Sequence, residues 1–81
     1  MARLIYEIAK DINDDWNTIG KGVSPYARPY IDALAQLDNI DDNYYLDSAD
    51  SVIRYFLANA STYRGEKAKA LKAELKAMLK Y

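Results

Sequence analysis

The side chains available for chemistry in this chain are mainly carboxylates, because its 81 residues include no histidine and no cysteine. The chain therefore lacks the commonest general base, the commonest transition-metal ligand and any thiolate nucleophile. Paired carboxylates could still act as an acid and a base, but so short a helical chain has little room for a deep pocket. We expect no enzymatic activity and no cofactor.

The carboxylates gather in two clusters within the first fifty residues. The first cluster comprises Glu7, Asp11, Asp14 and Asp15, and the second comprises Asp38, Asp41, Asp42, Asp47 and Asp50. One interpretation is an acidic face that imitates nucleic-acid phosphates and occupies a basic groove on a partner. The other is a solvated surface whose aspartates include helix caps. The first interpretation requires the two clusters to merge in space.

The second cluster also approaches the spacing of a calcium-binding loop. Oxygen-bearing side chains stand at the ligand positions of a twelve-residue window, namely Asn39, Asp41, Asn43, Asp47 and Asp50. The sixth position, normally glycine, is Tyr44, and the last position holds an aspartate instead of the longer bidentate glutamate. We therefore predict no metal site.

Positive charge gathers in the other part of the chain. Residues 1–50 carry ten acids and four bases, whereas residues 51–81 carry seven bases and two acids. One face of the last predicted helix carries Lys69, Lys72, Lys76 and Lys80, with Arg64 near its start. A nucleic-acid-binding surface built on Arg64, Lys69, Lys72 and Lys76 is thus the alternative to an acidic binding face. Ordinary solubilisation of a surface helix explains the same pattern.

Eight tyrosines and one tryptophan are many for a chain of this length. Tyrosine is enriched at protein interfaces because it buries a large area and keeps a polar tip. For any single tyrosine, packing into the hydrophobic core is the better explanation of its presence. We predict an exposed aromatic patch beside the second acidic cluster. The predicted partner-binding residues are Asp14, Asp15, Asp38, Asp41, Asp42, Tyr44 and Tyr45.

Apolar residues recur every three or four positions in four segments of the chain. This spacing predicts one all-α domain over residues 1–81, a small four-helix bundle of antiparallel-type helices joined by short loops. The predicted helices span 3–19, 25–37, 48–60 and 62–80. The third, apolar on more than one face, is expected to be the most buried. With no apolar run near ~18 residues and no secretion signal, we expect a cytoplasmic protein that does not enter membranes.

Glycine and proline mark the ends of the first two predicted helices. Gly20 suits the left-handed backbone conformation that often follows the last residue of a helix. If the second helix begins at Pro25, Pro29 bends its first turn; otherwise a single turn over 25–28 precedes a helix that begins at Pro29. Residues 38–46 are predicted to form a connecting loop, pinned by its apolar side chains Ile40, Tyr44, Tyr45 and Leu46.

Polar cap residues precede the last two predicted helices. Asp47 is predicted to cap the third helix, and Ser61 or Thr62 the fourth. Gly65 would then lie in the first turn of the fourth helix, where glycine is unfavourable. We expect close approach of another side chain, Trp16 or Tyr63, to require it.

Two long segments of the chain resemble a family of small uncharacterised bacteriophage and prophage accessory proteins. They are Phe56-Leu-Ala-Asn-Ala-Ser-Thr-Tyr-Arg-Gly-Glu and Leu71-Lys-Ala-Glu-Leu-Lys-Ala-Met-Leu. Shorter elements in the same order are Asp15-Trp16, Pro25-Tyr26-Ala27, Pro29-Tyr30 and Asp47-Ser48-Ala49. The resemblance implies a short accessory gene of a phage, with no agreed activity to carry over.

By analogy with that family, the expected function is to bind and inhibit a host protein, such as a CRISPR effector or another defence effector. The expected partner is a host or phage protein with a basic surface, met in the cytoplasm of the infected host cell. A nucleic-acid partner is the alternative, and a homo-oligomer is compatible with both hypotheses.

Overall fold

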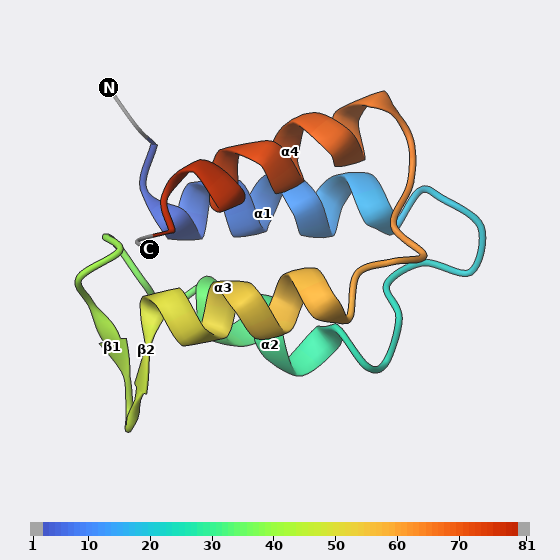
Figure 1. The fold of residues 1–81 in the computed structure, drawn as a ribbon. Helices are drawn as coiled ribbons and strands as arrows, with labels where there is room; N and C mark the ends of the chain where they lie inside the picture. The colour runs from blue at the N-terminus through green and yellow to red at the C-terminus, as the bar shows by residue number, and fades with distance from the viewer. Residues whose placement is uncertain (1–2, 80–81) are drawn as a thin grey trace.

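The four segments with helical spacing form four helices, and a small β-hairpin spans the end of the predicted loop and the predicted start of the third helix. The protein is described from a computed structural model over residues 3–79. The helices are α1 (Ile5–Trp16), α2 (Arg28–Leu34), α3 (Ala49–Ala58) and α4 (Glu66–Ala77), and the strands are β1 (Asn43–Tyr44) and β2 (Asp47–Ser48). The chain is therefore mostly helical, but the all-α description omits a two-stranded sheet (Figure 1).

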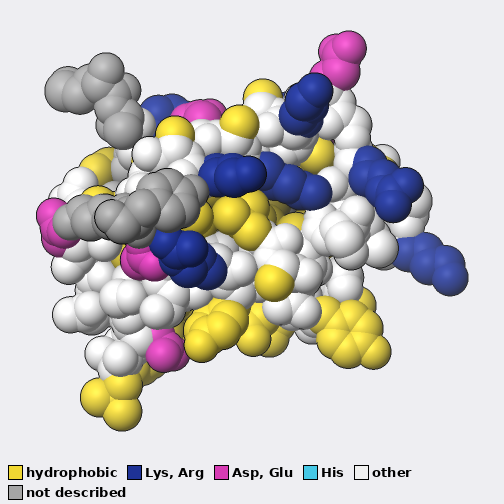
Figure 2. Space-filling model, in the orientation of Figure 1, with side chains coloured by type: hydrophobic (Ala, Val, Ile, Leu, Met, Phe, Trp, Pro, Cys, Tyr) yellow, Lys and Arg dark blue, Asp and Glu magenta, His cyan; other side chains and the backbone are white. Residues whose placement is uncertain are grey.

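The helices form two pairs. α1 and α4, the first and last helices, lie side by side, and α2 packs against α3. Each helix runs opposite to the one before it along the chain (Figure 1). The hairpin projects from the body near the start of α3, and hydrophobic side chains lie at its end (Figure 2). No helix within residues 3–79 has the length and apolar content needed to cross a membrane.

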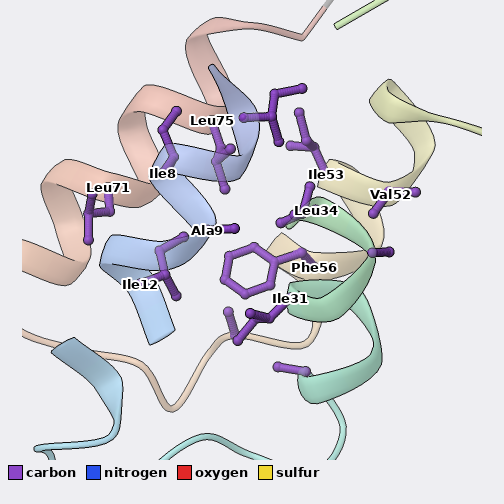
Figure 3. Packing of buried hydrophobic residues seen from close by; sticks show 14 of the residues in the cluster. Ile8, Ala9, Ile12, Ile31, Leu34, Val52, Ile53, Phe56, Leu71 and Leu75 are labelled. Atoms are coloured by element: carbon purple, nitrogen blue, oxygen red, sulfur yellow. The ribbon is translucent and has the colours of Figure 1, made fainter. Parts of the chain in front are cut away.

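The core fills the space between the two helix pairs. Ala9 and Ile12 of α1 lie next to the ring of Phe56 of α3 there, and Ile8 of α1 lies beside Leu75 of α4 (Figure 3). The spacing of the buried residues in α1 is the one that the sequence predicts. The sequence predicts α3 to be the most buried helix, but four of its ten residues are buried, a share no larger than the five of twelve in α1, and Tyr55 on its outer side is 52% exposed.

The first two helices are shorter than predicted. α1 ends at Trp16 because the Asp15 carbonyl accepts bonds from the Thr18 N–H and hydroxyl, at 3.0 and 2.6 Å, which form a tighter turn. Gly20, with φ of 51°, has the predicted left-handed conformation. The structure supports the second alternative for Pro29: a separate turn precedes α2, and the proline lies in the first turn of a helix that begins at Arg28.

The last two helices are also shorter, and the predicted caps are wrong. Ser48, not Asp47, caps α3, and its hydroxyl accepts the Ser51 N–H at 3.1 Å. Neither Ser61 nor Thr62 caps α4, because the chain remains non-helical as far as Gly65, which occupies the N-cap position. The residue that ends the last predicted helix, Lys80, lies outside the described residues.

Gly65 is required by its backbone conformation rather than by packing. Its φ of 124° and ψ of 173° lie in a region open essentially only to glycine. The expectation that Trp16 or Tyr63 crowds it is wrong, since nothing lies within 4 Å of the position that a Cβ would take.

We expect the substitution Gly65→Ala to lower the free energy of unfolding by about 1–3 kcal/mol, the cost of holding an L-residue in this region. Gly65→Leu should cost a similar amount, because open space surrounds the new Cβ. Urea unfolding of both variants measures the two costs. A leucine variant that is much less stable than the alanine variant would show that close packing does require the glycine.

A candidate protein-binding face at the β-hairpin

The hairpin has a tight turn with an unusual residue. Asn43 pairs with Ser48 and Tyr44 with Asp47, which leaves Tyr45 and Leu46 as the two turn residues. Tyr45 has φ of 55°, a left-handed value that such turns normally give to glycine or asparagine. A bulky L-residue in that conformation costs about 1–2 kcal/mol. The turn therefore presents a tyrosine against its local backbone preference.

The two turn residues are the most exposed large hydrophobic residues described in the chain. Tyr45 is 83% exposed and Leu46 is 102% exposed. The expectation that they pin a loop to the core is wrong, because Ile40 and Tyr44 pack on the core instead. The ring of Tyr44 meets the ring of Tyr45 edge-on, with centroids 4.7 Å apart. One tyrosine thus supports the other at the end of the hairpin.

Asp42 holds the base of the hairpin. Its carboxylate accepts the N–H groups of Asn39 and Asp38 at 3.0 and 2.9 Å, and these bonds lower the pKa of Asp42 below its ordinary value. Its carbonyl accepts the N–H of Ala49, the first residue of α3, at 2.9 Å. Asp42, predicted to bind a partner, therefore has a structural role.

The segment before the hairpin is fastened to α1. The N–H groups of Ile5 and Tyr6 donate to the carbonyls of Asp38 and Leu37, both at 2.9 Å. These bonds satisfy two of the donors that a helix N-terminus leaves without an intrahelical partner. Because Ser48 also caps α3 directly after β2, both ends of the hairpin join fixed parts of the fold. The turn residues are exposed on a rigid support.

The predicted acidic face is divided in the structure. Asp38, Asp41 and Asp42 lie near the start of α1, whereas Asp14 and Asp15 lie in its last turn, roughly 15 Å away along the helix axis. Asp15 has an internal partner, because its carboxylate accepts the Tyr63 hydroxyl at 2.7 Å. Burial, and then this bond, raise the pKa of Tyr63. Asp14 and Asp15 therefore do not form one surface with Asp38, Asp41 and Asp42.

The basic residues form a separate surface on α4. Three of its lysines, Lys69, Lys72 and Lys76, surround a hollow of about 380 Å³ whose apolar lining is Leu57 of α3 and Ala73 of α4. Figure 2 shows Lys and Arg side chains around hydrophobic ones on this face. The hollow is apolar inside and cationic at its edge.

Two of the four predicted nucleic-acid contacts are bonded within the fold. Lys72 Nζ donates to the Ala60 carbonyl at 2.7 Å and lies 5.5 Å from the centre of the Tyr63 ring. Burial, with a smaller effect from Arg64, lowers the pKa of Lys72. Arg64 Nε donates to the Ser61 carbonyl at 3.3 Å. Lys69 and Lys76 are exposed.

The residues with calcium-like spacing, in the window 39–50, do not form a group of metal ligands. In the part of the chain that the structure describes, no group of three or more acidic side chains is placed to hold a metal ion. The hairpin divides the window, with Asn43 and Asp47 on its two strands.

Leu46 is the residue of this face that the sequence-based prediction missed. The available signal was a pair of large side chains, Tyr45-Leu46, between the polar residues Asn43 and Asp47. The chain matches no protein-family model, no curated protein and no solved structure.

Proposed function

We propose that this chain is a non-enzymatic protein that binds a partner protein through its hairpin turn. The observation that carries the proposal is the pair Tyr45 and Leu46, both almost fully exposed and held on a rigid base. A single exposed leucine needs no explanation, but a tyrosine held beside it at positive φ does. Exposed aromatic side chains with a polar surround are typical of interface anchors.

The charges around the turn indicate the chemistry of the partner. Asp47 follows the turn directly and is exposed, and Asp38 is exposed at the base of the hairpin. A complementary partner has an apolar pocket bordered by basic side chains. The resemblance to phage accessory proteins supports a host defence protein, such as a CRISPR effector, inhibited in the host cytoplasm by occupation of its basic surface.

Nucleic-acid binding by α4 is the second candidate, supported by the exposed side chains of Lys69 and Lys76. It ranks lower because Lys72 and Arg64 donate to carbonyls of the chain itself. Phosphates would also leave the apolar lining of the hollow uncovered.

The proposal is tested with hairpin variants in a pull-down from bacterial lysate, followed by a Kd measurement on the identified protein. Leu46→Asp and Tyr45→Gly should each weaken binding by about 2–4 kcal/mol, or roughly 30–1,000-fold, as expected for central anchors. Glycine suits the left-handed turn, so the loss in Tyr45→Gly would not come from unfolding.

The matched control is Tyr26→Ala, which removes a tyrosine that is 76% exposed on a different loop. Its Kd should equal that of the wild type. Equal Kd values for the wild type and both hairpin variants would refute the hairpin as the anchor. Salt-sensitive retention of duplex DNA that is lost in Lys69→Glu/Lys76→Glu would favour the second candidate.

A further inference from the structure

The chain carries two surfaces that are both apolar at the centre and are opposite in charge. The hairpin turn is an apolar projection, Tyr45 and Leu46, followed by the exposed carboxylate of Asp47. The hollow between α3 and α4 is apolar at Leu57 and Ala73 and is bordered by lysines. An apolar side chain entering the hollow would cover its lining, and an acid beside it would meet the lysines.

We propose that the hollow binds the hairpin turn of a second copy of this chain, so that two copies associate head to tail. Leu46 enters between Leu57 and Ala73, and Asp47 lies against Lys69 and Lys76. The proposal goes beyond the proposed function, which uses the hairpin and leaves the hollow without a ligand.

The hairpin that fills the hollow must come from another molecule. The hairpin leaves the body near the start of α3 and extends away from it, whereas the hollow lies between Leu57, near the end of α3, and α4 (Figure 1). The charge distribution favours a copy of the same chain as the occupant. The hairpin carries the exposed Asp47 and the hollow is bordered by Lys69 and Lys76, so contact between two copies brings opposite charges together.

The expected association is weak and depends on salt. A two-residue turn covers less surface than the ~1,200–2,000 Å² that a standard stable interface buries. Exposed ion pairs lose most of their attraction as ionic strength rises. Self-association would also occupy the hairpin that we propose for the host partner, so the two interactions would compete.

The test is sedimentation equilibrium of the full chain over a range of concentrations. At about 0.05 M salt the average mass should rise with concentration, and about 0.5 M salt should reduce that rise. Leu46→Asp places a charge on the apolar hairpin turn, and Lys69→Glu/Lys76→Glu reverses the charge at the edge of the hollow. Each variant should weaken association at least about tenfold. Lys67→Glu, at an exposed lysine of α4 that does not line the hollow, is the charge control and should associate like the wild type.

Mixing the two defective variants gives the decisive result. The Leu46→Asp chain keeps an intact hollow and the Lys69→Glu/Lys76→Glu chain keeps an intact hairpin, so the mixture should associate more strongly than either variant alone. A mixture that stays monomeric, or a wild type that stays monomeric up to about 1 mM, would overturn the proposal. So would a wild type that stays monomeric and binds duplex DNA through Lys69 and Lys76.

The same variants separate this inference from the proposed function. Lys69→Glu/Lys76→Glu should weaken self-association and leave the Kd for the host partner unchanged when it is measured at concentrations too low for self-association, whereas Leu46→Asp should weaken both. Self-association without a host partner would refute the proposed function alone, and a host partner without self-association would refute this inference alone.

Discussion

Replacement of Tyr63 by alanine should remove about 3–5 kcal/mol from the free energy of unfolding, the usual cost of deleting a buried aromatic ring. The ring is fully buried and stacks on Trp16, with centroids 4.7 Å apart and an interplanar angle of 17°. Its hydroxyl donates to Asp15 at 2.7 Å, and the ammonium group of Lys72 lies beside its ring. Tyr63 is thus the residue that attaches the segment between α3 and α4 to the end of α1.

The loss is large compared with the stability that such a chain can have. A domain of this length typically has a free energy of unfolding of about 4–12 kcal/mol. Tyr63→Ala should lower the melting temperature by roughly 12–40 °C, as measured by circular dichroism. Tyr63→Phe is the control, because it keeps the stacked ring and removes only the bond to Asp15, at a cost of about 1–2 kcal/mol. Equal losses in both variants would contradict a dominant role for the ring.

The second large effect is expected for Phe56→Ala, again about 3–5 kcal/mol. Phe56 is fully buried, and its ring lies between α1 and the α2–α3 pair (Figure 3). Its removal would leave a cavity that backbone shifts can only partly close. Urea unfolding measures the change.

The neighbouring Tyr55 provides the matched control for that prediction. It is 52% exposed and contacts the ring of Tyr30 at a centroid distance of 5.8 Å. Tyr55→Ala should cost about 1 kcal/mol or less. If Tyr55→Ala were as destabilising as Phe56→Ala, the inward and outward faces of α3 would have to be reassigned.

The helical part of the fold was predictable because its signal is local. Ile5, Ile8, Ile12 and Trp16 are spaced for one face of a helix, and all four are buried. Helix ends were less predictable, since they depend on tertiary contacts. Ser61 and Thr62 are good cap residues, but they lie in a turn closed by the bond from the Tyr63 N–H to the Ala60 carbonyl, and Tyr63 stacks on Trp16.

The hairpin could not be predicted from its residues. Its strands have two residues each, which is too short for an alternating pattern, and its turn lacks the glycine that usually marks such turns. The internal hydrogen bonds of the charged residues could not be predicted for a different reason. Asp15 binds a residue 48 positions away, and Lys72 binds a carbonyl 12 positions away, so only the fold shows these roles.

The stacking of Trp16 on Tyr63 also gives the protein an intrinsic optical probe. Trp16 is the only tryptophan in the sequence and is 2% exposed, so its fluorescence should shift to longer wavelength when water reaches the indole. It lies at the end of α1 opposite to the hairpin base, which is bonded to Ile5 and Tyr6. Hairpin variants should therefore keep the native emission spectrum, whereas opening of the segment that carries Tyr63 should change it before the helices unfold.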